Sequence, residues 1–214
     1  MAAGKFITFE GGEGAGKSTQ ARLLAARLIA RGRDVVVTRE PGGAPCAEAI
    51  RQLLLQPGAI PADALTEALL FNAARADHLV SLIRPALARG ADVLCDRFAD
   101  STRAYQGAAG NLQAATIDQL EAIVVGPTRP DLTLVLDLEP AAGLVRANVR
   151  RSSAGTIGTD QFEGRGLGFH ERLRQGFLAI AAAEPQRCLV VPADGEADAV
   201  GELVWRAVAQ RLGL

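Results

Sequence analysis

Lysine is almost missing from this chain: of its 23 basic residues only Lys5 and Lys17 are lysines, and the others are arginines. Cysteine is scarce as well. Cys46, Cys95 and Cys188 are odd in number, far apart and without metal-ligand spacing, which argues against a disulfide framework and against a cysteine metal site. We therefore expect reduced, buried thiols. Lys17 is the more conspicuous lysine, because it lies in a glycine-rich segment.

The chain also lacks net charge and long apolar runs. Its formal charge of −1 gives no general attraction to nucleic acid or to an anionic membrane. No segment approaches the ~18 apolar residues of a membrane span, and the N-terminal MAAGKFITFE has no apolar signal core. We therefore expect a cytoplasmic protein whose partners are neither nucleic acid nor membrane. Its 214 residues suit one domain, 1–214, with a full hydrophobic core.

Short apolar runs alternate with helical segments along the whole chain. Strands that are apolar on both faces and separated by helices predict an α/β fold, with a parallel sheet covered on both sides. In such sheets ligands bind beyond the carboxyl ends of the strands. The five expected strands are 5–10, 35–38, 92–96, 132–137 and 188–191. The expected helices are 20–30, 48–55, 63–89, 113–125 and 198–212.

The segment FEGGEGAGKSTQ, residues 9–20, contains the pattern G-x-x-x-x-G-K-[ST] between an expected strand and an expected helix. Its glycines let backbone N–H groups turn around phosphate oxygens, and the helix that begins near Lys17 adds the positive end of its dipole. Lys17 would contact the β- and γ-phosphates, and Ser18 would ligate magnesium. The pattern predicts a P-loop NTPase fold, without separating a kinase from a GTPase, another ATPase or a switch. The residues expected to bind the triphosphate are Gly11, Gly12, Glu13, Gly14, Ala15, Gly16, Lys17, Ser18 and Thr19.

A second magnesium partner should be an acid at the end of an apolar strand. Asp96 ends VLCD and Asp137 ends TLVLD, and the strand pattern alone leaves the two nearly even. Asp96 is favoured because Arg97, an anion-binding group, follows it. Asp137 is followed by Glu139, and this stretch is typical of a helix start with acids at its positive end.

Arginines follow two strand ends. Arg39 lies in TREPGG and Arg97 follows Asp96. A kinase that acts on a monophosphate needs cations to hold the acceptor phosphate, and bidentate arginine suits that task. A third group, with Arg150 and Arg151, precedes a small, polar segment at 152–159. We interpret about 147–166 as a flexible lid that closes over the phosphates and supplies an arginine.

Taken together, these segments resemble the thymidylate kinase family, the ATP-dependent dTMP kinases. The motifs FEGGEGAGKST, TREPGG, LLFNAARADH, DRFADSTRAYQG, RPDLTLVLDLEP and FHERLRQGF occur in the family's order over nearly the whole chain. The phosphate loop is shared by many families, whereas TREPGG and DRFADSTRAYQG are much more specific. The resemblance implies transfer of the γ-phosphoryl group of ATP to dTMP, with Mg²⁺ as cofactor, and a homodimer.

The resemblance also implies roles for individual residues. Arg39 and Arg97 would hold the dTMP phosphate, and Asp96 rather than Asp137 would organise magnesium. Phe71 would stack on the thymine, and Arg75 would bond its exocyclic oxygen. The residues left to line the base and sugar are Thr102, Tyr105 and Gln106, with Glu13 approaching the sugar.

The lid departs from the family's pattern. The family usually carries Asp-Arg-Phe-Glu, whereas this chain has Gln161 in the place of that arginine. Its phosphate loop contains no arginine either. The lid must therefore supply the catalytic arginine from Arg150, Arg151 or Arg165, of which we favour the first two.

Because the acceptor phosphate is itself an adequate nucleophile, catalysis depends on positioning and charge neutralisation by Lys17, magnesium, Arg39, Arg97 and a lid arginine. His78 and His170 are then structural. Two alternatives stay open: another nucleoside monophosphate kinase, and a P-loop switch or partitioning ATPase with no monophosphate acceptor. A GTPase would need an Asn-Lys-x-Asp segment, and the sequence has none.

Overall fold

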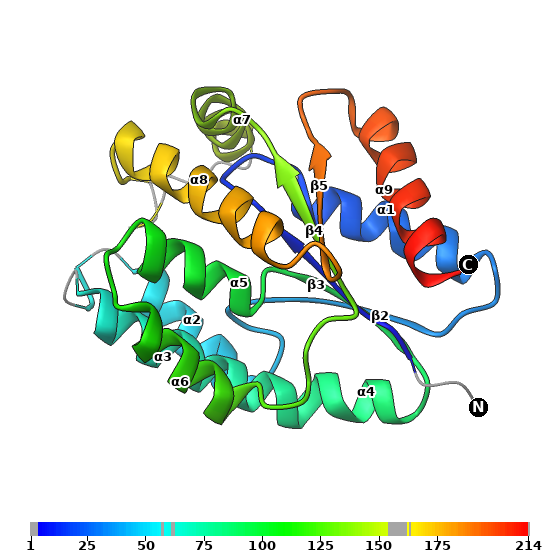
Figure 1. Ribbon diagram of the computed structural model, residues 1–214, viewed down its shortest axis with the longest axis horizontal. Helices are drawn as coiled ribbons and strands as arrows, with labels where there is room; N and C mark the ends of the chain where they lie inside the picture. The colour runs from blue at the N-terminus through cyan, green and yellow to red at the C-terminus, as the bar shows by residue number, and fades with distance from the viewer. Residues whose placement is uncertain (1–3, 57, 61–62, 154–161, 163, 214) are drawn as a thin grey trace.

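The computed structural model of the chain describes residues 4–56, 58–60, 63–153, 162 and 164–213 (Figure 1). Its centre is a sheet of five parallel strands in the order β2-β3-β1-β4-β5. The strands are β1 Phe6–Glu10, β2 Val35–Arg39, β3 Asp92–Asp96, β4 Leu132–Asp137 and β5 Cys188–Pro192. Their bounds agree with the expected strands to within one residue at each end, and the parallel α/β prediction is confirmed.

The register of the sheet brings the candidate residues to one edge. Phe9, just before the glycine-rich loop, pairs with Asp96, and Asp96 also pairs with Arg39 on its other side. β1 lies between β3 and β4, so the chain leaves it where the strand order reverses. That point is where doubly wound sheets bind ligands.

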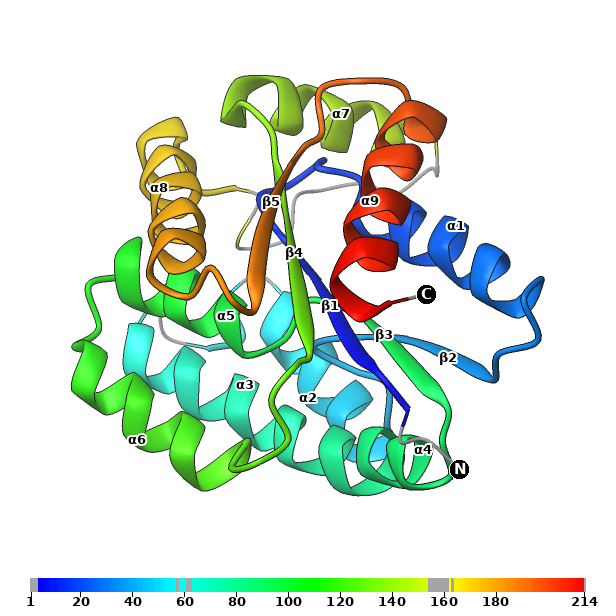
Figure 2. The ribbon, with the colours of Figure 1, turned by 45° about the vertical axis from the view of Figure 1, so that its right-hand side comes forward.

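Helices cover both faces of the sheet, as Figures 1 and 2 show. On one face α1 and α9 pack against Ile7, Phe9 and Leu134. On the other face the η1–α4 segment packs on Phe6 and Val93, while α8 packs at the β4–β5 end. The helices are α1 Lys17–Ile29, α2 Pro45–Leu55, α3 Ala64–His78, η1 Leu79–Ile83, α4 Arg84–Ala88, α5 Ala99–Thr102, η2 Arg103–Ala108, α6 Ala114–Val124, α7 Pro140–Ser153, α8 Leu167–Ala183 and α9 Ala197–Leu212.

The structure revises the expected helices in several places. The helix expected at 63–89 is a continuous run of α3, a π-helical turn η1 and α4, and it begins where the Asp63 carboxylate accepts the Thr66 N–H at 2.8 Å. The helices at 99–108 and 167–183, and also α7, were not among the expected helices, and α1 and α2 each begin three residues earlier than expected. The centre of the expected lid, 154–161 with Gln161, and also residue 163, lie outside the described residues.

Cysteine burial is confirmed in part. Cys95 and Cys188 are buried free thiols, whereas Cys46 is exposed because it lies on the outer side of the first turn of α2. Over the part of the chain that the structure describes, no helix is both long and apolar enough to cross a membrane.

Candidate active site

The glycine-rich loop wraps around the start of α1. Gly16 adopts a left-handed conformation (φ 89°) directly before Lys17, and Gly11 (φ 132°) and Gly14 (φ 68°) also have positive φ. A Cβ on Gly11 would lie 2.4 Å from a carbonyl oxygen of β4, and one on Gly14 would lie 2.1 Å from a carbonyl oxygen of α7. Only glycine fits at these two positions. The loop therefore leaves its backbone N–H groups and the positive end of α1 for an anion.

Lys17 lies across the mouth of this loop. Its Nζ donates to the carbonyl oxygens of Gly11 at 3.1 Å and Gly12 at 2.7 Å. Burial, followed by the charge of Arg97, lowers the pKa of Lys17 to about 8, against the opposing carboxylates of Glu13 and Asp96. An anion bound in the loop would favour the charged ammonium.

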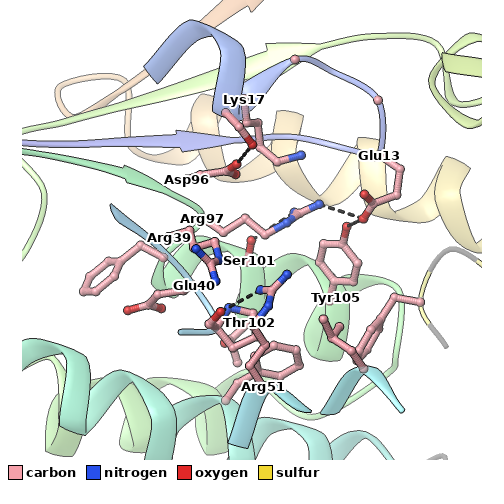
Figure 3. A pocket seen from close by; sticks show the side chains of 18 of the residues that line it. Glu13, Lys17, Arg39, Glu40, Arg51, Asp96, Arg97, Ser101, Thr102 and Tyr105 are labelled. Carbon is pink, nitrogen blue, oxygen red and sulfur yellow. Dashed lines mark hydrogen bonds and ion pairs between the residues drawn. The ribbon is translucent and has the colours of Figure 1, made fainter. Parts of the chain in front are cut away.

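Ser18 and Asp96 meet at the predicted metal position. The Ser18 hydroxyl donates to Oδ2 of Asp96, which ends β3 beside the loop (Figure 3). Asp137 instead accepts from Nε of Arg174 at 2.7 Å and from the same guanidinium at 3.0 Å. Of the two acids that the strand pattern left open, Asp96 is the one beside Ser18. Among the described residues no three His, Cys, Asp or Glu side chains form a metal cage, so a cation here would take further ligands from phosphate and water. Mg²⁺ binds in that way.

Arg97 lies opposite Lys17, in the strained left-handed region with φ 70°. Its guanidinium donates to Glu13 at 2.8 Å, to the Gly11 carbonyl at 3.1 Å and to Ser101 at 3.3 Å. It also lies 4.9 Å from the centre of the Tyr105 ring. Figure 3 shows Arg97 between the glycine-rich loop and Tyr105, pointing across the pocket toward Glu13. This fixed cation is therefore part of the wall that faces the phosphate loop.

Glu13 joins two side chains of the opposite wall. Its Oε1 accepts both from Arg97 and from the Tyr105 hydroxyl, the latter at 2.6 Å. Burial would raise the pKa of Glu13, but Arg97, Lys17 and the Tyr105 hydrogen bond outweigh it and lower that pKa to about 2. Glu13 is thus ionised at neutral pH, and its hydrogen bond to Tyr105 connects the glycine-rich loop to η2.

A buried acid that the sequence did not single out shapes the same wall. Glu10 ends β1, and its carboxyl group accepts from the Phe98 backbone at 2.7 Å and from the Ser101 hydroxyl at 2.6 Å. Burial, with a contribution from Asp100, raises the pKa of Glu10 to about 8. Glu10 thereby fixes the turn that presents Arg97, and its position at the end of the first strand is the signal that could have found it.

Two arginines extend the cationic surface. Arg39 ends β2 and pairs with Glu48 of α2 at 2.9 Å. Arg51 of α2 donates to the Pro41 carbonyl at 2.7 Å and lines the same pocket. Sequence reasoning missed Arg51, because only the packing of α2 beside the strand ends brings it to the site.

The far end of the pocket is aromatic and polar. Phe71, Thr102, Tyr105 and Gln106 line it as predicted, and the Phe71 ring lies 5.6 Å from the Phe162 ring. The pocket has a volume of about 430 Å³ and runs from the phosphate loop to this end, within the range of small-ligand sites.

The predicted residues along the pocket, phosphate loop and acceptor side together, are Glu13, Gly14, Gly16, Lys17, Ser18, Thr19, Arg39, Phe71, Asp96, Arg97, Thr102, Tyr105, Gln106 and Arg150. Those not predicted are Arg22, Glu40, Pro41, Arg51, Leu55, Phe98, Ser101 and Phe162.

Arg75 lies behind this lining. Its Nε donates to Glu40 at 2.8 Å and its other nitrogens donate to Asn72, Thr102 and the Phe98 carbonyl at 3.1–3.2 Å. His78 bonds Glu40 from the other side at 3.0 Å. Arg75 therefore holds Thr102 in place, and its direct contact with a thymine stays a prediction.

The three candidate lid arginines lie in different surroundings. Arg150 lines the pocket, Arg151 donates to Asn148 on its own helix, and Arg165 pairs with buried Glu67 of α3. Arg165 is also flanked by the Phe162 and Phe169 rings at 4.8 and 4.6 Å. Of the three, Arg150 is the one that lines the described pocket.

His78 and His170 lie in packed surroundings. His78 is fully buried between Glu40 and the Thr38 hydroxyl, and His170 is buried on α8 with its ring against Phe169. Neither residue lines the described pocket, which agrees with their expected structural roles.

Comparison with known proteins gives a consistent result. The family model described as thymidylate kinase matches residues 9–204. The thymidylate kinase of Caulobacter vibrioides is 59% identical over the whole of both chains, and one from Rhodopseudomonas palustris is 53% identical over 98% of this chain and 90% of its own. A crystal structure of thymidylate kinase from Ehrlichia chaffeensis superposes with a TM-score of 0.77 at 35% identity, covering 97% of this chain and all of the other.

Proposed function

The chain belongs to the thymidylate kinase family, and we propose that its pocket holds ATP–Mg²⁺ and dTMP with their phosphates facing one another. As a member of that family the protein phosphorylates dTMP with ATP, giving dTDP and ADP. The observation that carries the proposal is the contact of Arg97 with the Gly11 carbonyl at 3.1 Å. This contact supports the proposal because it joins Arg97, the proposed cation for the acceptor phosphate, to the glycine-rich loop proposed for the donor.

The donor end is built by the phosphate loop. Backbone N–H groups around Gly14 and Gly16 and the ammonium of Lys17 hold the β- and γ-phosphates. Ser18 and Asp96 are the residues that would hold Mg²⁺. When bound, Mg²⁺ neutralises charge on the β- and γ-phosphate oxygens. Ser18 and Asp96 already touch in the structure, which supports a pre-formed half-site.

The acceptor end takes dTMP. Arg97, Arg39 and Arg51 hold its phosphate, since all three line the pocket beside the loop. Phe71 stacks on the thymine, and Gln106 and Thr102 face its polar edge. The remaining proposed contacts are those of Tyr105 and Glu13 with the sugar and of Arg75 with the thymine oxygen.

Catalysis here needs no general base, because the acceptor phosphate attacks directly. The chain's contribution is to orient the two phosphates and to neutralise the charge that spreads over the transferred group. Arg150 of α7 supplies a further positive charge for this neutralisation, because it lines the pocket while Arg165 is paired with Glu67. The lid segment excludes water that would otherwise hydrolyse ATP.

We also propose a homodimer that forms through neighbouring helices. Leu69 of α3, Val80 of η1 and Ile123 of α6 are 50%, 64% and 80% exposed, and α3 packs directly against both η1 and α6. Large apolar side chains grouped on one side are typical of subunit interfaces. The proposed location is the cytoplasm, where both nucleotide substrates occur.

The test is ADP formation from ATP and Mg²⁺ with dTMP, dUMP, dCMP, AMP or GMP as acceptor. Fastest turnover with dTMP, and negligible turnover without an acceptor, supports the proposal. In the same assay Arg150→Ala should lower kcat more than Arg151→Ala does. Steady hydrolysis that is indifferent to every acceptor would mean that the loop serves a nucleotide switch.

A further inference from the structure

Glu67 is a buried carboxylate for which the phosphoryl transfer has no use. It lies in the first turn of α3 and is 1% exposed. One of its oxygens accepts from Nε2 of Gln106 at 2.9 Å, and the other accepts from Arg165. A carboxylate at this depth is costly unless both oxygens are paired, and here they are. It joins a pocket residue to the chain that returns from the lid.

The contact with Glu67 fixes which way the Gln106 amide faces. The oxygen and nitrogen of a glutamine amide have nearly the same shape, so only hydrogen-bond partners decide between the two orientations. A carboxylate only accepts, and it therefore requires the NH₂ group of Gln106 to face it. Gln106 is 1% exposed and cannot turn to solvent. Its oxygen, Oε1, is the amide atom left for the pocket that Gln106 lines.

Arg165 pairs with the oxygen of Glu67 that Gln106 does not use. The guanidinium is held between the rings of Phe162 and Phe169, at 4.8 and 4.6 Å from their centres, and it pairs with Glu67 while only 23% of its side chain is exposed. This ion pair holds the Glu67 side chain in the position from which its second oxygen accepts from Gln106. Arg165 is not among the residues that line the described pocket, so its effect on Gln106 passes through Glu67.

We propose that Glu67, supported by Arg165, sets the base specificity of the enzyme by orienting Gln106. The inference rests on the proposed placement of the thymine beside Gln106. Thymine and uracil carry an N–H at ring position 3, which donates to an amide oxygen. Cytosine has a bare nitrogen with a lone pair there, which the same oxygen repels. The pocket thus selects imide bases and rejects cytosine through a residue that does not itself touch the base.

Glu67→Gln tests this with a change of one atom. The glutamine can donate as well as accept, so it no longer forces one orientation on Gln106. We expect kcat/KM for dTMP to fall about tenfold, mainly through KM, and the dTMP/dCMP ratio of kcat/KM to fall by roughly 10–100-fold, since a hydrogen bond lost or opposed is worth about 1–3 kcal/mol. The dTMP/dUMP ratio should stay unchanged, because both bases carry the N–H. KM for ATP should not move.

The controls separate orientation from general damage. Glu121→Gln changes another buried carboxylate, on α6, that pairs with Arg103 and Arg129 away from the pocket, and it should leave the dTMP/dCMP ratio unchanged. Gln106→Ala should lower that ratio by itself. Adding Glu67→Gln to Gln106→Ala should then lower it no further. This last comparison is a double-mutant cycle on the proposed contact.

The inference is overturned if Glu67→Gln lowers kcat/KM for dTMP, dUMP and dCMP in equal proportion. It is also overturned if Gln106→Ala keeps the dTMP/dCMP ratio of the wild type. The second result holds whether or not Glu67→Gln folds. If instead the proposed function is wrong, the wild-type enzyme forms ADP no faster with dTMP than it does without an acceptor.

Discussion

Arg97 donates a hydrogen bond to Glu13 at 2.8 Å and so joins the end of β3 to the phosphate loop. The two residues come from different strand ends and meet over the point where the sheet reverses its order. Because Glu13 also accepts from Tyr105, one carboxylate aligns the proposed phosphate-binding arginine and the proposed sugar-binding phenol. Donor and acceptor ends of the pocket are therefore held as one unit.

Replacement of Arg97 should chiefly lower the efficiency with which the enzyme uses dTMP. Arg97→Ala is expected to lower kcat/KM for dTMP by well over tenfold, in line with the roughly 1.5–3 kcal/mol of a hydrogen bond to a charged group. Arg97→Lys should recover only part of the loss, because an ammonium lacks the bidentate fork. Steady-state kinetics on variants with wild-type melting curves check this. A near-normal rate in Arg97→Ala would remove Arg97 from the site.

Protonation of Glu13 should lower the stability of the folded protein at acid pH. Its folded pKa of about 2 lies below the ordinary glutamate value of 4.5, so the stability that its ion pair contributes is present above pH 4.5 and is lost as the pH falls through 2. Glu13→Gln should therefore be less stable than the wild type by ~1–3 kcal/mol at pH 7. That gap should be constant down to about pH 5 and should narrow below pH 4.5. Urea unfolding across this range measures it, and a gap that is independent of pH would contradict the ion pair.

Phe71 should matter for one nucleotide only. Phe71→Ala is expected to raise KM for dTMP about tenfold, since stacking of a base on an aromatic ring is worth ~1–3 kcal/mol, and to leave KM for ATP almost unchanged. Ile29→Ala, at a 57% exposed position at the end of α1, serves as the surface control. Equal weakening of both nucleotides would mean that Phe71 only packs against Phe162.

Asp96 should determine the Mg²⁺ concentration that the enzyme needs for activity. Asp96→Asn keeps the size of the side chain but removes the charge beside Ser18, and the Mg²⁺ concentration for half-maximal activity should rise about tenfold or more. Asp137→Asn alters the rival strand-end acid, which pairs with Arg174, and should leave that concentration unchanged. A magnesium titration at saturating nucleotides decides between them.

Most of the fold followed from local pattern. The apolar runs at 92–96 and 132–137 gave the bounds of β3 and β4 as observed, because buried parallel strands are apolar on both faces. The phosphate loop was recognisable because its glycines are dictated by backbone geometry. The short helices at 99–108 were not, since their polar residues Thr102, Tyr105 and Gln106 face a pocket rather than solvent, which removes the amphipathic pattern.

The parts of the site that escaped prediction depend on distant contacts. Arg51 reaches the site only through the packing of α2 beside the strand ends. Glu67 contacts Gln106 across 39 positions and Arg165 across 98, and no local pattern encodes such pairs. The expectation that favours Asp96 over Asp137, by contrast, rests on the neighbouring Arg97 and on the family resemblance. The register of the sheet places Asp96 beside Phe9, just before the glycine-rich loop.

The central claim is that one pocket holds both nucleotides with their phosphates in line. The most direct measurement uses a single molecule in which adenosine and thymidine are joined through a polyphosphate chain. The account predicts that it inhibits competitively against ATP and also against dTMP, and binds more tightly than either. Competition with ATP alone, while dTMP still binds with its normal affinity, would place the acceptor outside this pocket and contradict the account.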